Sequence, residues 1–436
     1  MSLPAASRSR TSLAPAIAFT MLALILSIGA YVLAGFGKRG HLPATFAVYA
    51  TIFAFGYVGG LLVIRTFAPR VDPALFPTGA VLVGIGFAMI FRLSGGLAAE
   101  QATWILVGLV AFAITLVVVR DARMLDAYTY TIGLLGLLLL LLPIVPGIGQ
   151  TINGARLWVQ IGPLGFQPAE IGKVLIVIFL ASYLNQKREL LQVATSRIGP
   201  LRLPPAKHLG PVLLAWGASL AILFVQRDLG ASLLYFGIFV VMLWVATGRA
   251  SYLVIGVLLF AVGAYAGWLL FDHVQLRVDI WLHALDPDKV FGVGYGQLAQ
   301  AQFGMATGGL VGTGLGQGSP GIIPFAPTDF IFAAIGEELG LLGTTAVLLL
   351  FVVLVGKGLR IGIQAPDGFS TLLAVGLSTL VALQAFVIVG GVTRAIPLTG
   401  VTLPFVSYGG SSLVSNFVLL ALLVRVSSGP AERRRA

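Results

Sequence analysis

The chain has 436 residues, of which 58% are hydrophobic and only 10% are charged, and its mean hydropathy is +0.99. A soluble domain carries roughly 25% charged residues, so this composition excludes a soluble globular protein and predicts an integral membrane protein. The net charge of +11 does not indicate a partner of nucleic acids, because the Lys and Arg residues are scattered between apolar runs. The absence of cysteine excludes disulfides and thiolate metal sites, and the four histidines lack the spacing of metal ligands.

Apolar runs close to the roughly 20 residues that cross a bilayer recur along the whole chain. We expect the first run to be retained as a helix, because it is too long for the core of a signal peptide. The fold class is therefore an all-α, polytopic helical bundle with about twelve spans. These spans are expected at about 13 to 34, 43 to 66, 75 to 93, 102 to 120, 126 to 145, 168 to 186, 208 to 226, 229 to 247, 252 to 271, 330 to 356, 370 to 391 and 410 to 427.

Basic residues are concentrated in the even-numbered connections and in both tails, so the positive-inside rule predicts that both termini are cytoplasmic. Three connections on the other side are unlike short turns, namely residues 146 to 167, 272 to 329 and 393 to 409. The long connection contains two segments, 278 to 283 and 296 to 302, that have the character of short interfacial helices. Long loops on a rigid scaffold commonly carry function, so we expect the chemistry to face outward.

Ionisable residues at the ends of the predicted spans are the first candidates for chemistry, since a charge inside a bilayer costs about 2.5 to 3.5 kcal/mol. Glu170 and Lys173 lie one turn apart at the outer start of the sixth span. Their spacing fits a structural ion pair, and it fits a cationic site for an anionic lipid headgroup equally well. Asp228 precedes Gly230 in a tight outer turn, where turn chemistry and a role in holding a cation or a basic residue both fit.

Asp329, at the mouth of the tenth span, is the most informative acid. Helix capping explains an Asp at this place, but Glu337 and Glu338 follow in the same apolar helix, and capping does not require three carboxylates. An outward-facing acid in a partly dry cavity can act as a general base. The glycine-rich segment from 303 to 321 matches no nucleotide-binding motif and suits flexible backbone near a bulky substrate. The hydroxyl-rich segment from 404 to 412 fits a helix start or the lining of a site.

Taken in order, five short segments resemble the SEDS family (shape, elongation, division and sporulation), whose members RodA and FtsW polymerise the glycan strands of peptidoglycan. The segments are Asn153-Gly154-Ala155-Arg156 with Trp158, Gln167 to Glu170 with Lys173, Asp228-Leu229-Gly230, Thr328 to Gly340, and Pro404 to Ser412. Residues 1 to 150 match only in hydropathy. Because the family usually has ten spans, the resemblance implies two extra helices within residues 1 to 150 and a glycosyltransferase core at 151 to 436, with an outer loop at about 272 to 329. This arrangement is similar to the RodA-like branch of actinobacteria.

The resemblance implies that Asp329 is the essential aspartate and that Glu170, Lys173 and Asp228 belong to the same site. The implied reaction transfers a growing glycan from undecaprenyl diphosphate to the 4-hydroxyl of N-acetylglucosamine on lipid II, inverting to a β-1,4 bond at the outer face of the cytoplasmic membrane. Asp329 would accept the hydroxyl proton. The implied partner is a class B penicillin-binding transpeptidase.

The diphosphate leaving group needs positive charge, and the sequence does not rank the basic residues or exclude a divalent cation such as Mg²⁺ or Mn²⁺. The candidates for binding this group and the rest of the substrate, beside Glu170 and Asp228, are Lys173, Arg156, Arg277, Arg394, Glu337, Ser407, Tyr408 and Ser411. A lipid II flippase is the main alternative, and it would place a polar path through the middle of the helices. Here the polar residues cluster at the outer ends, which favours a polymerase. A noncatalytic scaffold would not need three acids at the mouth of one helix.

Overall fold

The computed structural model describes residues 13 to 429 apart from 153–154, 162–163, 193–195, 199–200, 204–212, 215–216, 219–220, 223–225, 227 and 293. Eleven helices in this part of the chain are long and apolar enough to cross a membrane, which confirms the predicted polytopic helical protein. The span predicted at 208 to 226 lies largely outside the described residues. The total of twelve spans and the cytoplasmic termini therefore stay predictions.

The spanning helices follow the apolar runs closely. Their bounds are α1 (Leu13–Arg39), α2 (Phe46–Phe67), α3 (Leu75–Leu93), α4 (Gly95–Val118), α5 (Thr129–Leu141) between the short 3-10 helices η1 (Ala122–Tyr128) and η2 (Leu142–Ile144), α6 (Pro168–Gln186), α9 (Leu229–Thr247), α10 (Ala250–Leu270), α13 (Ile331–Ile363), α14 (Gly368–Val392) and α15 (Gly410–Ser428). A short helix, α7 (Arg188–Gln192), follows α6.

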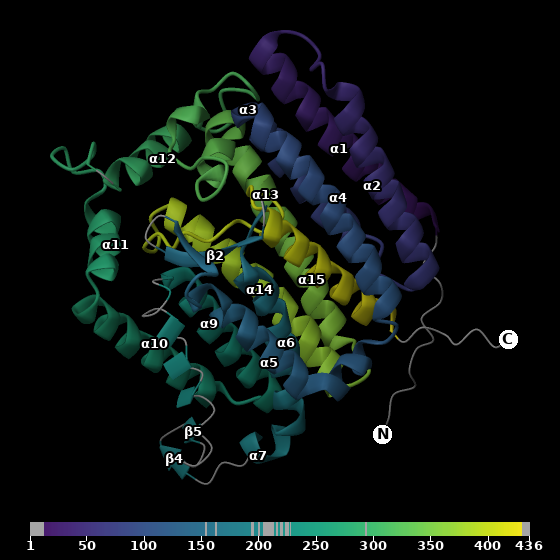
Figure 1. Ribbon diagram of the computed structural model, residues 1–436, viewed down its shortest axis with the longest axis vertical. Helices are drawn as coiled ribbons and strands as arrows, with labels where there is room; N and C mark the ends of the chain where they lie inside the picture. Colours follow the sequence, from purple (N-terminus) through teal and green to yellow (C-terminus); the bar gives the residue numbers. More distant parts are fainter. Residues whose placement is uncertain are drawn as a thin grey trace.

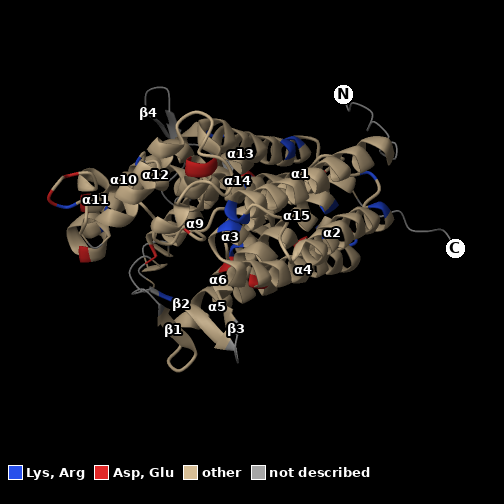
Figure 2. Cartoon of the chain, turned by 90° about the horizontal axis from the view of Figure 1, so that it is seen from above, with Lys and Arg blue, Asp and Glu red and all other residues tan. Residues whose placement is uncertain are grey.

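The helices α3, α14 and α15 are mostly buried, whereas α1 and α2 lie on one flank and α10 on the other (Figure 1). Few charged residues interrupt the helical body (Figure 2). Small residues let neighbouring helices approach closely. Helices in a bilayer associate through such close packing, because the hydrophobic effect does not drive them together there. A Cβ on Gly84 of α3, for example, would lie 2.0 Å from Ser27 Oγ of α1. Large apolar side chains such as Phe55 of α2 and Val257 of α10 are exposed, as on surfaces that face lipid.

The connection at 146 to 167 contains a small antiparallel sheet that was not predicted from the sequence. Its strands are β1 (Gly149–Ile152), β2 (Ala155–Ile161) and β3 (Leu164–Phe166), in the order β1-β2-β3. The Trp158 ring of β2 covers Gly165 of β3, where a side chain would meet it at 3.6 Å. Residues Asn153 and Gly154 lie outside the described residues. A second hairpin joins β4 (Ser196–Ile198) to β5 (Leu201–Leu203).

The long connection at 272 to 329 is largely helical. It contains α11 (Asp272–His283), α12 (Tyr295–Gly308) and the 3-10 turn η4 (Pro320–Ile322). The two short helices expected at 278 to 283 and 296 to 302 are thus confirmed, and both begin earlier or end later than expected.

The helix α13 is interrupted at Gly340, whose backbone has φ 65° and ψ −165°. A positive φ is accessible to glycine without steric cost, so the helix breaks here. The break frees backbone groups, and a polar backbone group must find a partner inside a membrane protein. The glycine-rich loop supplies the partners, because Leu341 N donates to Gly309 O at 2.9 Å and Thr313 N donates to Glu337 O at 3.0 Å.

The structure gives these loop glycines a packing role. A Cβ on Gly308 would lie 2.0 Å from Gly336 O, and one on Gly312 would lie 2.2 Å from Glu338 O. The loop therefore contacts the break in α13 backbone to backbone, which any side chain at these places would prevent.

Arg425 fixes the end of the bundle where α15 finishes. Its side chain is 1% exposed, and its guanidinium donates to Phe67 O, the last residue of α2, and to Leu116 O in the last turn of α4. A cation at a helix C-terminus offsets the helix dipole and satisfies orphan carbonyls. At this end, too, Lys357 Nζ of α13 lies 2.8 Å from Asp72 Oδ2. The opposite end of α13, which begins just after Asp329, therefore lies at the other end of the bundle.

We expect Arg425→Met to lower the stability of the fold by about 2 to 4 kcal/mol, because two carbonyls lose a charged donor. The change should appear as a lower midpoint of thermal unfolding in detergent. The control Arg360→Met removes an exposed arginine from the last turn of α13 and should leave the midpoint close to that of wild type. Equal midpoints for the two variants would contradict this role of Arg425.

Candidate active site

Three residues that are distant in sequence meet at the end of the bundle opposite to Arg425. Asp228 caps the start of α9, Arg277 belongs to α11, and Asp329 precedes α13. They surround the segment at Gly400, where a Cβ would lie 3.7 Å from Asp329 Oδ2 and 3.8 Å from Arg277 Nη2. The φ of Gly400 is +75°, a conformation that favours glycine. The backbone of this segment also accepts a hydrogen bond of 2.6 Å from Arg277 Nη1 through Leu398 O, which fixes the guanidinium.

Burial dominates the electrostatics of these three groups. It raises the pKa of Asp329 to about 6, against the lowering effects of Arg277 and of a hydrogen bond from Thr328. Burial also raises the pKa of Asp228, whose carboxylate accepts a hydrogen bond of 2.8 Å from Ala231 N. The pKa of Arg277 is lowered by burial, although both aspartates favour its charged form. The site thus places two acids around one cation in surroundings that disfavour charge.

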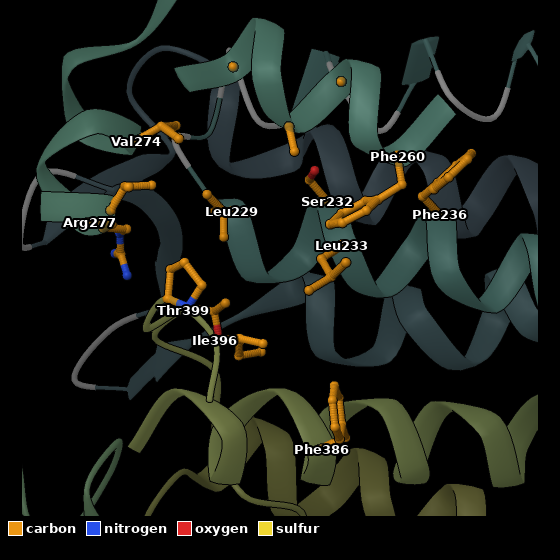
Figure 3. Close-up of a pocket in the computed structure, with 15 residues that line it drawn as sticks. Leu229, Ser232, Leu233, Phe236, Phe260, Val274, Arg277, Phe386, Ile396 and Thr399 are labelled. Atoms are coloured by element: carbon orange, nitrogen blue, oxygen red, sulfur yellow. The ribbon is translucent and has the colours of Figure 1, made fainter. Parts of the chain in front are cut away.

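An apolar groove leads away from Arg277 between α9, α10 and α14. Its volume is about 410 Å³, and its walls include Leu233, Phe236, Phe260 and Phe386. Figure 3 shows Arg277 at one end of the groove and Phe236 and Phe260 at the other. The groove can therefore take a long apolar group with a polar, anionic end placed at Arg277.

The predicted pair of Glu170 and Lys173 forms beside this site. Lys173 Nζ lies 2.8 Å from Glu170 Oε2, and both side chains are buried. Lys173 also donates to Gln384 Oε1 of α14 at 3.1 Å, and Gln384 Nε2 donates to Thr402 O at 2.9 Å. The pair therefore connects α6 to α14 and to the segment that carries Gly400. Gln384 was not among the predicted site residues, although its place as a polar residue inside an apolar run was a signal that could have found it.

Ser407 and Tyr408 hold the chain that leads to Asp329. Ser407 Oγ donates to Thr328 O at 2.6 Å, and Tyr408 N donates to Pro327 O at 2.8 Å. These two bonds fix the backbone on one side of the acid. The two residues thus position Asp329 through the backbone of the two residues that precede it.

Ser411 and Glu337 also bond to backbone. Ser411 Oγ accepts a hydrogen bond of 3.0 Å from Gln167 N, which joins the starts of α6 and α15. Glu337 Oε1 accepts one of 2.6 Å from Ser319 N in the glycine-rich loop. Glu337 lies in the second turn of α13, whereas Asp329 lies before the helix begins.

Arg156 and Arg394 are engaged outside the group at Gly400. Arg156 Nη2 of β2 donates to Val145 O at 3.2 Å. Arg394 donates to Trp281 O and Leu282 O, each at 3.1 Å, and so caps the end of α11. Of the four cations that the sequence left unranked, the structure brings Arg277 to Asp329. In the described part of the chain, no group of three or more His, Cys, Asp or Glu side chains is arranged to hold a metal ion.

Comparison with known proteins identifies the family of the chain. The sequence profile of the FtsW/RodA/SpoVE family, described as cell cycle proteins, matches residues 75–431. The chain belongs to this family. It is 43% identical over 419 residues to "Peptidoglycan glycosyltransferase RodA" of Mycobacterium tuberculosis. The match covers 93% of this chain and 88% of the relative. It is 32% identical over 372 residues to "Probable peptidoglycan glycosyltransferase FtsW" of Geobacter metallireducens, with 82% and 95% covered.

Two solved structures have a similar fold. A structure described as "Structural coordination of polymerization and crosslinking by a peptidoglycan synthase complex" matches with a TM-score of 0.66 and 27% identity, covering 82% of this chain and 97% of the other. The crystal structure of RodA from Thermus thermophilus matches with a TM-score of 0.56 and 24% identity, covering 83% and 98%. At this identity, the second match bears on the fold alone.

We expect Arg277→Met to raise the pKa of Asp329 above about 6, because the guanidinium favours the ionised carboxylate. Infrared difference spectra recorded over a pH titration should detect the band of the protonated carboxyl. The band is assigned to Asp329 because it is absent in Asp329→Asn. Arg156→Met, which removes a cation bonded elsewhere, should leave the titration unchanged. An unchanged or lower pKa in Arg277→Met would show that the arginine does not act on this acid.

Proposed function

We propose that this chain polymerises glycan strands from lipid-linked precursors at the outer face of the cytoplasmic membrane, with lipid II as the acceptor. As a member of its family, the chain is a multi-pass membrane enzyme, a peptidoglycan glycosyltransferase of cell-wall synthesis. The observation that carries the finer proposal is the apolar groove that ends at Arg277 beside Asp329. This arrangement suits a substrate with an apolar tail, a charged diphosphate and a sugar at the reacting end.

The tail of the donor would lie along the groove and continue into the bilayer. Each buried methylene contributes about 0.8 kcal/mol, so a polyprenyl chain gains binding energy from walls such as Phe236 and Phe260. This binding energy can be used to hold the reacting sugar in place. Positioning the sugar speeds the reaction, whereas binding the tail alone only increases the affinity for the substrate.

Arg277 is the cation that we assign to the diphosphate. Lys173 is already paired with Glu170, while Arg156 and Arg394 donate to backbone carbonyls away from Asp329. Four helices, α6, α9, α13 and α15, also begin near the site, and their N-termini favour an anion. A divalent cation remains compatible with this proposal, since Mg²⁺ is usually held by one or two carboxylates together with substrate phosphates. Asp228 is the carboxylate suited to hold it, and the cation would help to neutralise the leaving group.

Asp329 is the base in this proposal. The acceptor hydroxyl attacks the anomeric carbon of the donor sugar and gives its proton to the Asp329 carboxylate. The bond from that carbon to the diphosphate breaks on the opposite face, which inverts the configuration, and the leaving diphosphate carries the electron pair toward Arg277. A pKa of about 6 leaves most of the carboxylate ionised at pH 7 and makes it a stronger base than an ordinary aspartate.

A class B penicillin-binding transpeptidase is the proposed partner. A polymer of glycan strands must be cross-linked to bear load, and the solved structure with 27% identity describes a complex that coordinates polymerisation with cross-linking.

Asp329→Asn should lower the rate of glycan polymerisation by about 10² to 10⁴-fold, because the amide cannot accept the proton. The measurement is polymerisation of fluorescent lipid II by the purified protein with its transpeptidase partner. Asp288→Asn makes the same chemical change at an exposed aspartate and should retain full activity. Equal activity in wild type and Asp329→Asn would remove Asp329 from the mechanism. Absence of polymer in wild type, together with lipid translocation in vesicles, would support a flippase instead.

The pH dependence of kcat/KM should report the Asp329 carboxyl. Because the pKa is raised to about 6, protonation abolishes the base as pH falls through 6, and activity should drop about tenfold for each further unit. An unperturbed aspartate, with a pKa of about 3.9, would keep activity down to about pH 4. A profile of that kind would contradict the buried base. In Arg277→Met the acidic limb should move to higher pH.

A further inference from the structure

The helices α1 and α2 form a hairpin, the N-terminal hairpin (residues 13 to 67), that lies before the region matched by the family profile, which begins at residue 75. The hairpin is antiparallel, as shown by the hydrogen bond of 3.2 Å between Ser27 Oγ and Tyr57 OH and by the ring contact between Tyr31 and Tyr49. It packs closely on α3, where Tyr57 OH donates to Ala80 O at 2.6 Å. Family membership does not explain what this hairpin contributes.

The outer end of α1 touches the glycine-rich loop that binds the break in α13. A Cβ on Gly37 would lie 1.9 Å from Leu315 O, and a Cβ on Gly316 would lie 2.6 Å from Lys38 N. Gln317 Nε2 also donates to Gly37 O at 3.2 Å. The two backbones therefore meet directly, with no room for a side chain between them.

Arg92, at the end of α3, forms the next layer of contacts. Lys38 Nζ donates to Arg92 O at 2.8 Å. The Arg92 guanidinium in turn lies 2.8 Å from Glu338 Oε1 and donates to Gly318 O at 2.7 Å. The outer end of α1 is thus connected through α3 to the loop and to the break in α13.

Two carboxylates of α13 hold the same loop from the other side. Glu338 Oε2 accepts a hydrogen bond of 2.9 Å from Gly316 N, and Glu337 Oε1 accepts one of 2.6 Å from Ser319 N. From Ser319 onward the chain proceeds to Asp329 through consecutive turns. They are closed by backbone hydrogen bonds such as Ile322 N to Ser319 O, Ala326 N to Ile323 O, and Phe330 N to Phe325 O.

We propose that the N-terminal hairpin is a positioning element for catalysis, which fixes the glycine-rich loop through Gly37 and Lys38 and thereby sets the place of Asp329. The inference rests on the proposed function, because it assigns Asp329 as the base. Gly37, Lys38 and Arg92 are positioning residues, since their contacts reach the acid through the loop. A displacement of about 1 Å in a catalytic group can cost about 100-fold in rate, so a fixed loop matters to the reaction.

Gly37→Ala tests the contact, and Gly29→Ala is its matched control. Both glycines lie in α1, and both changes raise helix propensity equally. A Cβ on Gly29 meets nothing within 4 Å, whereas one on Gly37 overlaps Leu315 O. We expect Gly37→Ala to lower kcat by about 10 to 100-fold, with KM for lipid II changed less than about threefold, and Gly29→Ala to match wild type.

A second readout follows the loop without relying on turnover. The chain has no cysteine, so Ile322→Cys and Leu349→Cys, both at exposed positions, can carry two spin labels without background labelling. Pulsed electron paramagnetic resonance then measures the distance from the loop to the body of α13. We expect this distance distribution to broaden or shift in Gly37→Ala and to stay unchanged in Gly29→Ala.

Lys38→Met and Arg39→Met give a milder pair in case Gly37→Ala does not fold. Both remove one exposed positive charge from the end of α1, but Lys38 is the one that donates to Arg92 O. Lower kcat together with a shifted loop in Lys38→Met, but not in Arg39→Met, supports the proposal.

Three outcomes would overturn the proposal. They are an unchanged loop distance in both test variants, a shifted loop with full turnover, and loss of turnover with an unchanged loop. If the wild-type protein makes no glycan polymer, the proposed function fails by itself. The spin-label distances still decide whether the hairpin fixes the loop.

Discussion

The site depends on the charge interaction between the Asp329 carboxylate and the nearby Arg277 guanidinium, both of which are shielded from water. Removing charge from water costs several kcal/mol per ion unless other groups compensate. Here Arg277 donates to Leu398 O, and Asp228 accepts a bond from Ala231 N. Burial raises the pKa of Asp329 despite the opposing charge of Arg277, so the surroundings that disfavour the charge of this carboxylate also make it a useful base.

The break in α13 shows how a membrane protein introduces irregular backbone near such a site. Backbone groups freed at Gly340 must be satisfied within the protein, and the glycine-rich loop satisfies them through residues such as Gly309 and Thr313. The loop in turn is held by Glu337 and Glu338. Glu337 and Glu338 therefore hold the loop that leads to Asp329.

Local sequence predicted the spanning helices because a run of about 20 apolar residues is sufficient to specify a span. It also predicted the pair at Glu170 and Lys173, since helical spacing decides whether such residues meet. It did not predict the sheet from β1 to β3, whose short strands give a weak periodic signal next to glycine and proline. Gln384 was missed because its partners, Lys173 and Thr402, lie far away in sequence.

The sequence by itself determined the membrane class, the positions of the described spans and a short set of candidate residues, because hydropathy and helical spacing act over neighbouring residues. Only the tertiary structure decided which candidates meet. It placed Arg277 beside Asp329 and committed Arg394 to the end of α11, since both outcomes depend on how α11 packs against the segment from 393 to 409. The pKa of Asp329 was likewise decided by folding, because it depends on burial and on the charges of Arg277 and Asp228, which come from two other parts of the chain.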